Sequence, residues 1–404
     1  MRVLVIAQYF PPDMGGGATR AYNVAKGLEL NGCEVTVVTA FPHYPVGDVP
    51  AKYRWKLLSV EYMDGFKVFR TFVFPLASEG IFKRVLLFLS FAVSSLFALP
   101  FVGRVDVVWA ANPNVIGFFP GLVYGFVKGC PLVQNVDDLW PESLYDLGMS
   151  RKSLLGWFGE FLARIAYRGV SAITPISPGY VNVICGKYGV DREKVHVVRA
   201  GVDLDKFKVN GKPVNCRDKT FRVLYSGAFS LAYDFDQVLQ AAKKLENVDG
   251  VEFVLQGGGE LLGYVKNGVK ELELQNVKVV DKIVSREEVA KLLSEADALL
   301  LPLRDFGKPY LGLSSKLYEY QAAGKPIICC ADGQPAEYVK ETGSGVVVKP
   351  GDYEALAKAV LYLKENKDTA WKLGVSGRRY VENNLSIEKI GSKMMMLFGK
   401  VLAD

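Results

Sequence analysis

The first half of the chain alternates short runs of Val, Ile and Leu with longer segments whose apolar residues recur at helical spacing. The short runs are continuous rather than strictly alternating, as is typical of strands buried on both faces of a parallel sheet. Strands alternating with helices predict an α/β domain. The expected strands are residues 2–10, 34–40, 66–74, 106–112, 131–136 and 171–177, with a helix over 18–32.

The pattern breaks near residue 199 and starts again near 221. Residues 199–219 are polar, rich in turn formers and weak in periodicity, which indicates an interdomain linker. A chain of 404 residues is also too long for one core. We therefore expect parallel-sheet domains over 1–199 and 200–385 facing across a cleft, with the last helix, 386–404, packed back on the first. The second domain's expected strands are 221–227, 251–256, 276–281, 297–302, 326–331 and 345–349, with helices over 234–246, 286–296 and 314–324.

Residues 85–103 carry no charge and approach the length of a membrane span. They include three serines and Pro100, and they lie between the expected strands 66–74 and 106–112. If those strands share one sheet, the segment cannot cross a bilayer between them. The sequence thus favours a buried crossover helix over a helix on the membrane surface, and disfavours a true span.

Composition narrows the functional classes. Half of the residues are hydrophobic and 23% are charged, which is typical of a globular chain. The net charge of +6 is spread along the sequence, which argues against a dedicated nucleic-acid binder but suits anionic small ligands or an anionic membrane surface. The six cysteines show no CxxC spacing, so we expect reduced thiols in a cytoplasmic protein.

Two glycine clusters follow expected strands. Gly15, Gly16 and Gly17 precede the first helix, where backbone amides and the helix dipole favour a phosphate or carboxylate. A dinucleotide site would need a third glycine where Arg20 stands, which argues against a dehydrogenase. The second cluster, Gly257 to Gly259, follows strand 251–256 and faces the expected ligand crevice. A plain flexible turn stays open for both.

The densest set of candidate residues is GLSSKLYEYQAAGKPII, residues 312–328. Its first four residues can present amides at a helix start, Lys316 adds a cation suited to a diphosphate, and Glu319 follows one turn later. Carboxylates bind vicinal hydroxyls well. The alternative is an ordinary amphipathic helix with Lys and Glu on its surface.

Asp137 and Asp138 end the apolar run PLVQNV, in the stretch QNVDDLWPES. Three interpretations are open: a reaction centre, a metal site and the polar end of a strand. Neighbouring strand residues point to opposite faces and no third ligand is evident, which disfavours a metal.

Taken together, these motifs resemble the retaining nucleotide-sugar glycosyltransferases of family 4, which have the two-domain GT-B fold of Rossmann-like sheets. The resemblance covers nearly the whole chain. DLWPES narrows it to the branch of N-acetylfucosaminyl and related amino-sugar transferases of polysaccharide or lipid-linked oligosaccharide assembly. The motifs that carry it are PPDMGGGATR, NPN after strand 106–112, ISPGY, AGVDLDKF, GGGE, ADALLLPL, SKLYEYQAAGKPII and GVVVKPGD.

The resemblance implies a UDP-sugar donor held mainly by the second domain, an acceptor held by the first, retention of anomeric configuration and no required metal or other cofactor. It assigns the ribose hydroxyls to Glu319 and a backbone contact with the base to Ile283. Gly16 and Gly17 would close over the diphosphate. The remaining implied donor-binding residues are Gly227, Gly257, Gly258, Gly312, Leu313, Ser314, Ser315 and Lys316.

The sequence departs from the family pattern at several positions. Leu311 replaces an acid usually found eight residues before Glu319, which puts the identity of the sugar in doubt. Ala228 and Asp234 stand near the usual Arg and Lys, so Lys316 would carry most of the catalytic neutralisation of the diphosphate.

Asp138 occupies the position of a family histidine that faces the sugar. It is therefore a candidate catalytic residue that would accept a hydrogen bond from the donor sugar or a proton from the acceptor hydroxyl. A purely structural acid at the strand end is the alternative.

The expected function is transfer of a hexosyl or N-acetylhexosaminyl group from a UDP-sugar to a lipid-linked or glycan acceptor. The expected location is cytoplasmic, and peripheral contact to the inner membrane face through residues 85–103 stays open as an alternative to a buried crossover. Two alternatives have the same architecture: a UDP-sugar 2-epimerase, disfavoured because His43 and His196 lie in no recognised motif, and a non-catalytic nucleotide-sugar-binding protein.

Overall fold

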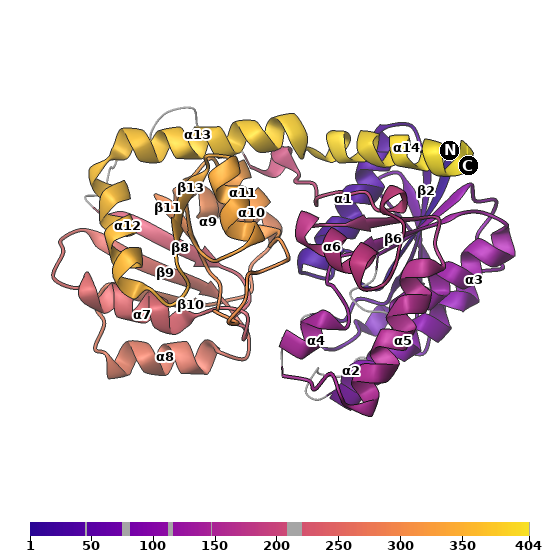
Figure 1. Cartoon of the computed structure of the whole chain (residues 1–404), viewed down its shortest axis with the longest axis horizontal. Coiled ribbons are helices and arrows are strands. Elements are labelled where there is room, and N and C mark those ends of the chain that lie inside the picture. The colour runs from indigo at the N-terminus through magenta and orange to yellow at the C-terminus, as the bar shows by residue number, and fades with distance from the viewer. Residues whose placement is uncertain (45–46, 75–80, 112–115, 147, 208–219, 404) are drawn as a thin grey trace. The chain divides into compact units, whose positions relative to one another are not determined.

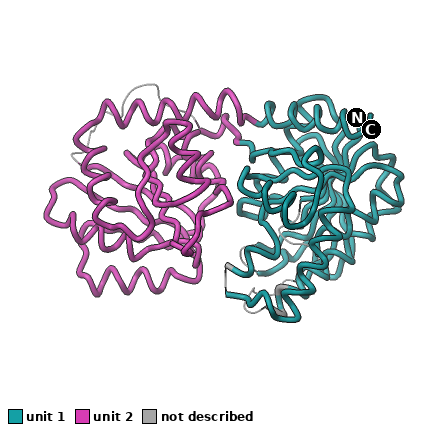
Figure 2. Tube along the Cα trace, in the orientation of Figure 1, with its two compact units in different colours: residues 1–201, 387–404 teal, residues 202–386 magenta. Residues whose placement is uncertain are grey.

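The chain divides into two compact units (Figure 2). The computed structural model describes residues 1–44, 47–74, 81–111, 116–146, 148–207 and 220–403, with the backbone alone at 81, 82, 84 and 146. Unit 1 comprises residues 1–201 and 387–404, and unit 2 comprises residues 202–386. The NPN motif at 112–114 and most of the expected linker, 208–219, lie outside the described residues.

In the described part of unit 1, seven strands form one sheet in the order β3-β4-β2-β1-β5-β6-β7 (Figure 1). The continuous apolar runs lie in its centre and pair in parallel, as predicted. The edge differs from the expectation, because β3 pairs antiparallel with β4. We did not predict β3, since LSVEYM mixes exposed and half-buried positions and lacks an apolar run. The strands are β1 (Arg2–Ala7), β2 (Glu34–Ala40), β3 (Leu58–Met63), β4 (Phe66–Thr71), β5 (Val107–Ala111), β6 (Leu132–Val136) and β7 (Ala172–Pro175).

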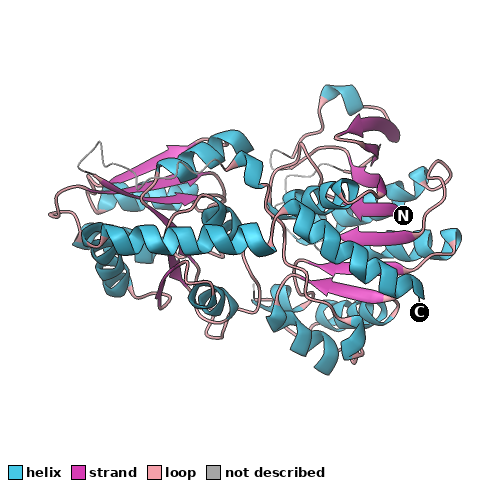
Figure 3. Cartoon of the chain, turned by 90° about the horizontal axis from the view of Figure 1, so that it is seen from above, coloured by secondary structure: helices cyan, strands magenta, loops and turns pink. Residues whose placement is uncertain are grey.

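Helices cover both faces of this sheet (Figures 1 and 3). Helix α1 connects β1 to β2 and packs against α14, the last helix of the chain. Helix α3 connects β5 to β6, and α5 lies between β6 and β7. These connections step along the sheet in the direction opposite to the step from β1 to β2, so right-handed crossovers put α3 and α5 on the other face from α1. The helices are α1 (Gly16–Leu30), α2 (Ile81–Ser94), α3 (Phe119–Lys128), α4 (Glu142–Asp146), α5 (Leu154–Arg168), α6 (Pro178–Gly186) and α14 (Ile387–Ala403), with 3-10 turns at Ala51–Tyr53, Ser95–Ala98 (η2), Ile116–Phe118 (η3) and Arg192–Lys194.

Residues 85–103 form most of α2 and the 3-10 turn η2, between β4 and β5. Because both strands belong to the same sheet, the segment is a crossover, as predicted. Phe91 and Ala98 are fully buried, whereas Leu89, Val93 and Phe97 are exposed. Within the described ranges, no helix has the length and apolarity needed to traverse a lipid bilayer.

Unit 2 contains a parallel sheet whose described strands follow the order β10-β9-β8-β11-β12-β13. All of the strands predicted for this half are present. They are β8 (Phe221–Ser226), β9 (Val251–Gly257), β10 (Val277–Asp281), β11 (Ala298–Pro302), β12 (Ile327–Cys330) and β13 (Gly345–Val348). The helices are α7 (Phe235–Lys244), α8 (Leu262–Glu271), α9 (Arg286–Glu295), α10 (Lys316–Ala322), α11 (Gln334–Glu341), α12 (Tyr353–Glu365) and α13 (Lys367–Asn384), with a 3-10 turn at Leu204–Lys206.

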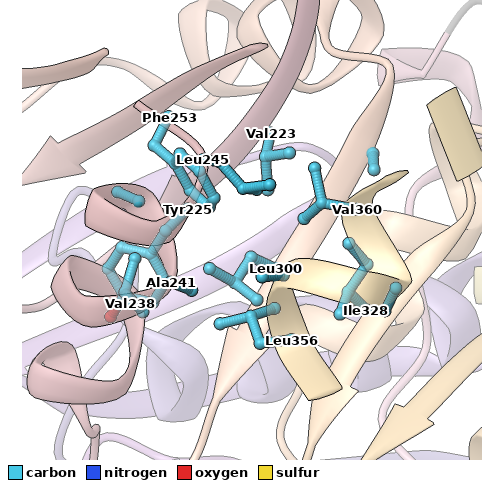
Figure 4. Close-up of a cluster of buried hydrophobic side chains, with 14 of the residues drawn as sticks. Val223, Tyr225, Val238, Ala241, Leu245, Phe253, Leu300, Ile328, Leu356 and Val360 are labelled. Carbon is cyan, nitrogen blue, oxygen red and sulfur yellow. The ribbon is translucent and has the colours of Figure 1, made fainter. Parts of the chain in front are cut away.

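The core of unit 2 lies between the sheet and helices α7 and α12 (Figure 4). Val223 and Leu300 from neighbouring strands meet Val238 of α7 and Val360 of α12, and all four are fully buried. Burying such side chains contributes about 1.5–3 kcal/mol each relative to leaving them exposed. This packing fixes the carboxyl ends of the strands, where the candidate site lies.

Candidate functional site

Lys316 is the first residue of α10, and its ammonium group lies at the carboxyl end of β8. Its Nζ donates a hydrogen bond to the carbonyl oxygen of Ser226 at 3.0 Å. The same Nζ lies 5.6 Å from the ring centre of Tyr225 and 5.9 Å from that of Tyr233. A cation is attracted to aromatic faces, so the two rings and the carbonyl of Ser226 hold the ammonium group in one orientation. The sequence did not predict Tyr225 or Tyr233 as site residues, because neither belongs to one of the recognised motifs.

The glycine loops beside Lys316 pack backbone against backbone. A Cβ atom at Gly227 would overlap the Lys316 ammonium group, and one at Gly257 would overlap the carbonyl of Gly227. Both residues also have a positive φ, which L residues rarely adopt. The amide of Phe229 donates to the carbonyl of Gly258 at 2.8 Å, joining the two loops. These glycines therefore shape the site whether or not they touch a ligand.

Residues 312–315 lead into α10, as the sequence predicted. Gly312 and Leu313 are buried, whereas Ser314 and Ser315 are half-buried. The amides of the second and third residues of α10 already have partners: Leu317 donates to the carbonyl of Ser314 and Tyr318 to that of Ser315, at 3.1 and 3.2 Å. Among the side chains of this segment, the polar groups of Ser314, Ser315 and Lys316 are half-buried.

Glu319 lies one turn into α10 and is paired with a residue that the sequence analysis missed. Its Oε1 accepts a hydrogen bond from Nη2 of Arg286 at 2.5 Å, and the Glu319 side chain is 16% exposed. Arg286 is the first residue of α9 and stands three residues after Ile283. The sequence places Arg286 next to the Ser285 helix cap and close to Ile283, a predicted site residue. It does not reveal the partner, because Glu319 is 33 residues away in the chain.

Ile283 lies in the loop after β10, with its side chain exposed. A chain of hydrogen bonds fixes this loop: Ser226 donates to Gln256 at 2.6 Å, and Gln256 donates to the carbonyl of Lys282 at 2.5 Å. The structure thus brings Gly227, the second glycine cluster and Ile283 to one edge of the unit 2 sheet.

In unit 1, the loop between β1 and α1 is fixed by Asp13. Its Oδ1 accepts hydrogen bonds from the amides of His43 and Tyr44 at 2.8 and 2.9 Å. Gly16 and Gly17 are the first two residues of α1. A Cβ atom at Gly17 would meet no atom within 4 Å, so space for packing does not require this glycine.

The paired aspartates at the end of β6 have different surroundings. Asp137 Oδ1 lies 3.0 Å from Nε of Arg20, a residue of α1 that is almost fully buried. Arg20 also donates to Asn135 and to the carbonyl of Val198. Asp138 is exposed, and among the described residues its carboxylate has no hydrogen-bond or ion-pair partner. Asp137 therefore connects the end of β6 to α1 through Arg20, whereas Asp138 is available to a ligand.

Electrostatics also distinguishes Asp138 from an ordinary surface acid. Desolvation by the surrounding protein, and secondarily the negative charge of Asp137, raise the pKa of Asp138 to about 6, although the residue remains accessible to solvent. Desolvation also raises the pKa of Asp137, and the charge of Arg20 opposes that shift. At neutral pH, Asp138 is mostly ionised but close to its pKa, a state suited to proton exchange.

Asp234, one of the departures from the family pattern, caps helix α7. Its Oδ1 accepts a hydrogen bond from the amide of Gln237 at 3.0 Å. It therefore has a structural role in place of the usual cation. As for metals, no three His, Cys, Asp or Glu side chains gather in a ligand set anywhere in the part of the chain that the structure describes.

Two family models match the sequence, one to each half. The model for "Glycosyltransferase Family 4" matches residues 14–206, and that for "Glycosyl transferases group 1" matches residues 207–380. The chain is a family 4 glycosyltransferase. The match to family 4 ends and that to group 1 begins close to the boundary between the two structural units.

Known proteins extend this finding over almost the full length of the glycosyltransferase. The putative colanic acid biosynthesis glycosyl transferase WcaI of Escherichia coli K12 is 25% identical over 423 residues, covering 96% of this chain and 98% of that protein. Sucrose-phosphate synthase from Thermosynechococcus elongatus has a TM-score of 0.78 at 18% identity, covering 100% and 99% of the two chains. Anabaena HepE in complex with UDP has a TM-score of 0.72 at 15% identity, covering 99% and 100%. These likenesses confirm the predicted GT-B fold.

Proposed function

We propose that this glycosyltransferase transfers an N-acetylated amino sugar from a UDP-sugar to a lipid-linked or glycan acceptor, with retention of configuration. The observation that carries the proposal is the oriented Lys316 ammonium group, with Glu319 one helical turn away on the same edge of the sheet. A cation and a carboxylate at this spacing suit a diphosphate and a ribose. Support for UDP comes from HepE, and support for a polysaccharide product from WcaI.

In the proposed reaction, Lys316 stabilises the departing diphosphate. Glycosyl transfer passes through an oxocarbenium-like state in which the leaving group gains negative charge. A fixed cation aimed at that charge supplies transition-state stabilisation without reorganisation. The half-buried Ser314 and Ser315 would add hydrogen bonds to the phosphates, and Glu319 would hold the ribose hydroxyls.

Asp138 is the proposed residue of unit 1 for the sugar or the acceptor hydroxyl. Its pKa of about 6 leaves it mostly ionised at neutral pH, so it can accept a hydrogen bond or a proton. We further propose that no metal is required, that Gly16, Gly17 and the base contact of Ile283 complete the donor site, and that the reaction takes place at the cytoplasmic membrane face.

The test is a panel of UDP- and GDP-sugars, with thermal shift and nucleotide release as readouts. We expect a shift and UDP release with UDP-N-acetylhexosamines, unchanged by EDTA, and a product with the donor's anomeric configuration by NMR. A shift with GDP-sugars alone would overturn the proposed nucleotide. Exchange of the sugar's C2 hydrogen with solvent deuterium would instead indicate an epimerase.

A further inference from the structure

Most of the large apolar residues of helix α5 are exposed, and apart from Tyr167 its buried residues are small. Gly156, Ala163 and Ala166 are buried against the rest of unit 1. Trp157 is 66% exposed and Phe161 is 49% exposed, and their rings stack with centres 6.2 Å apart. An ordinary surface helix has the reverse arrangement, with apolar residues facing the core.

The inner side of α5 forms hydrogen bonds with the rest of unit 1, and these bonds oppose rotation of the helix about its axis. Glu160, the one acidic residue in the α5 sequence, accepts a hydrogen bond from Lys187 at 2.8 Å. Tyr145 donates to the carbonyl of Gly156 at 3.2 Å. The hydroxyl of Tyr167 donates to the carbonyl of Trp140. These bonds fix which side of α5 faces outward.

Helices α2 and α3 lie on the same face of the unit 1 sheet as α5 (Figure 1). On α2 and η2, the exposed Leu89, Val93 and Phe97 repeat at a spacing of four residues. On α3, which packs against α2, Phe126 is 90% exposed and Val127 is exposed beside it. We call the exposed sides of α2, η2, α3 and α5 the apolar face. Large apolar side chains exposed on several helices of one face indicate an interaction site.

The helices that form the apolar face contain more basic than acidic residues. The sequences of α2 and α3 contain no acidic residue, and the single acid of α5 is neutralised by Lys187. A symmetric contact between two copies would bring these like charges together, which disfavours a dimer. An anionic lipid surface is complementary to them. The exposed cations in these helices and in the residues that flank them are Lys83, Arg104, Arg151, Lys152, Arg164 and Arg168.

We propose that the apolar face binds the surface of an anionic lipid bilayer, with Trp157 and Phe161 inserted at the level of the headgroups. Aromatic residues on one side of a helix, bordered by Arg and Lys, are typical of helices that lie in a membrane interface. The site extends the expected contact through residues 85–103 to α3 and α5. It concerns the surface of unit 1 alone, and it stands whichever donor or acceptor the enzyme uses.

Vesicle flotation with the full chain tests the proposal, using phosphatidylcholine vesicles with and without phosphatidylglycerol. The wild type should float with the anionic vesicles. The double variant Trp157→Ser, Phe161→Ser should bind them at least about tenfold more weakly, because it removes two inserted apolar side chains. Lys152→Glu with Arg164→Glu should weaken binding about fivefold or more and remove most of its salt dependence.

Matched controls come from α13 of unit 2, where Trp371 and Lys372 are exposed. Trp371→Ser and Lys372→Glu should float like the wild type, and thermal unfolding should show that every variant is folded. Wild type that does not float, or a Trp157/Phe161 variant that floats equally well, would overturn the proposal. So would light scattering that shows a wild-type dimer converted to a monomer by the same two substitutions.

Discussion

Asp137 and Asp138 follow the same strand but differ in what surrounds them. The buried cation of Arg20 holds Asp137, whereas Asp138 is accessible and has a raised pKa of about 6. The sequence suggested this division only through the alternation of strand side chains.

Replacing Asp138 by Asn should leave UDP binding intact and lower the transfer rate by about 10²-fold, the usual contribution of a positioned acid or base. In the wild type, the rate should fall as the pH drops through about 6, because protonation removes the ionised form. The variant should lack this acid limb. The measurement is a pH–rate profile of UDP release, and a turnover equal to wild type would remove Asp138 from the mechanism.

Asp137→Asn is the contrasting variant. It takes the charged partner from buried Arg20, which should lower the free energy of unfolding by about 3 kcal/mol. Asp138→Asn should be at least as stable as wild type, because it removes a desolvated carboxylate beside Asp137. Urea denaturation measures both variants, and equal losses of stability would contradict the assigned roles.

Glu319 and Lys316 should be distinguishable by ligand. Glu319→Gln should weaken uridine and UDP by the same factor, about tenfold or more, since it acts on the ribose. Lys316→Ala should weaken UDP but not uridine, which lacks the diphosphate. Arg286→Ala should behave like Glu319→Gln because it removes the partner of that carboxylate. Calorimetric titration measures all three, with Lys244→Ala, from an exposed ion pair, as the control. A loss of uridine affinity in Lys316→Ala would contradict the assignment.

At the scale of elements, the glycines of the candidate site fall into two kinds. Gly257→Ala should destabilise the fold by about 1–3 kcal/mol, because the residue has a positive φ and a Cβ would overlap the loop after β8. Gly17→Ala should be neutral or slightly stabilising, since its surroundings are open and alanine favours a helix. Thermal unfolding checks both.

Activity then tests the role of Gly17 independently of folding. If Gly17 closes over the donor, Gly17→Ala should bind the UDP-sugar more weakly while its melting temperature is unchanged. Full donor affinity in that variant would show that the N-terminus of α1 does not approach the donor as the family resemblance implies.

The elements themselves were largely readable from the sequence. Buried parallel strands give continuous runs of Val, Ile and Leu, and each predicted run became a strand within a few residues. The edge strand β3 was missed for the same reason, because half of an edge strand faces solvent and carries no such run. The sequence also did not predict which side of α5 is buried. Most of its buried residues are small and many of its large apolar residues are exposed, so the usual pattern of apolar residues facing the core is missing.

At the scale of the whole molecule, nucleotide binding and membrane binding should be separable, because the proposed residues belong to different units. Lys316→Ala should lose UDP affinity and still float with anionic vesicles. The Trp157 and Phe161 double variant should keep UDP affinity and lose flotation. One variant that lost both, while its melting temperature stayed normal, would contradict this separation.

The sequence by itself determined the α/β strands and helices of the two halves and the glycine and lysine motifs at the strand ends, because these depend on local patterns and on residue types at fixed spacing. Only the tertiary structure decided which charged groups pair. Arg20 meets Asp137, and Arg286 meets Glu319, across long stretches of chain. It also decided which side of α5 remains in solvent. Such contacts depend on how separate elements pack, and no local pattern specifies them.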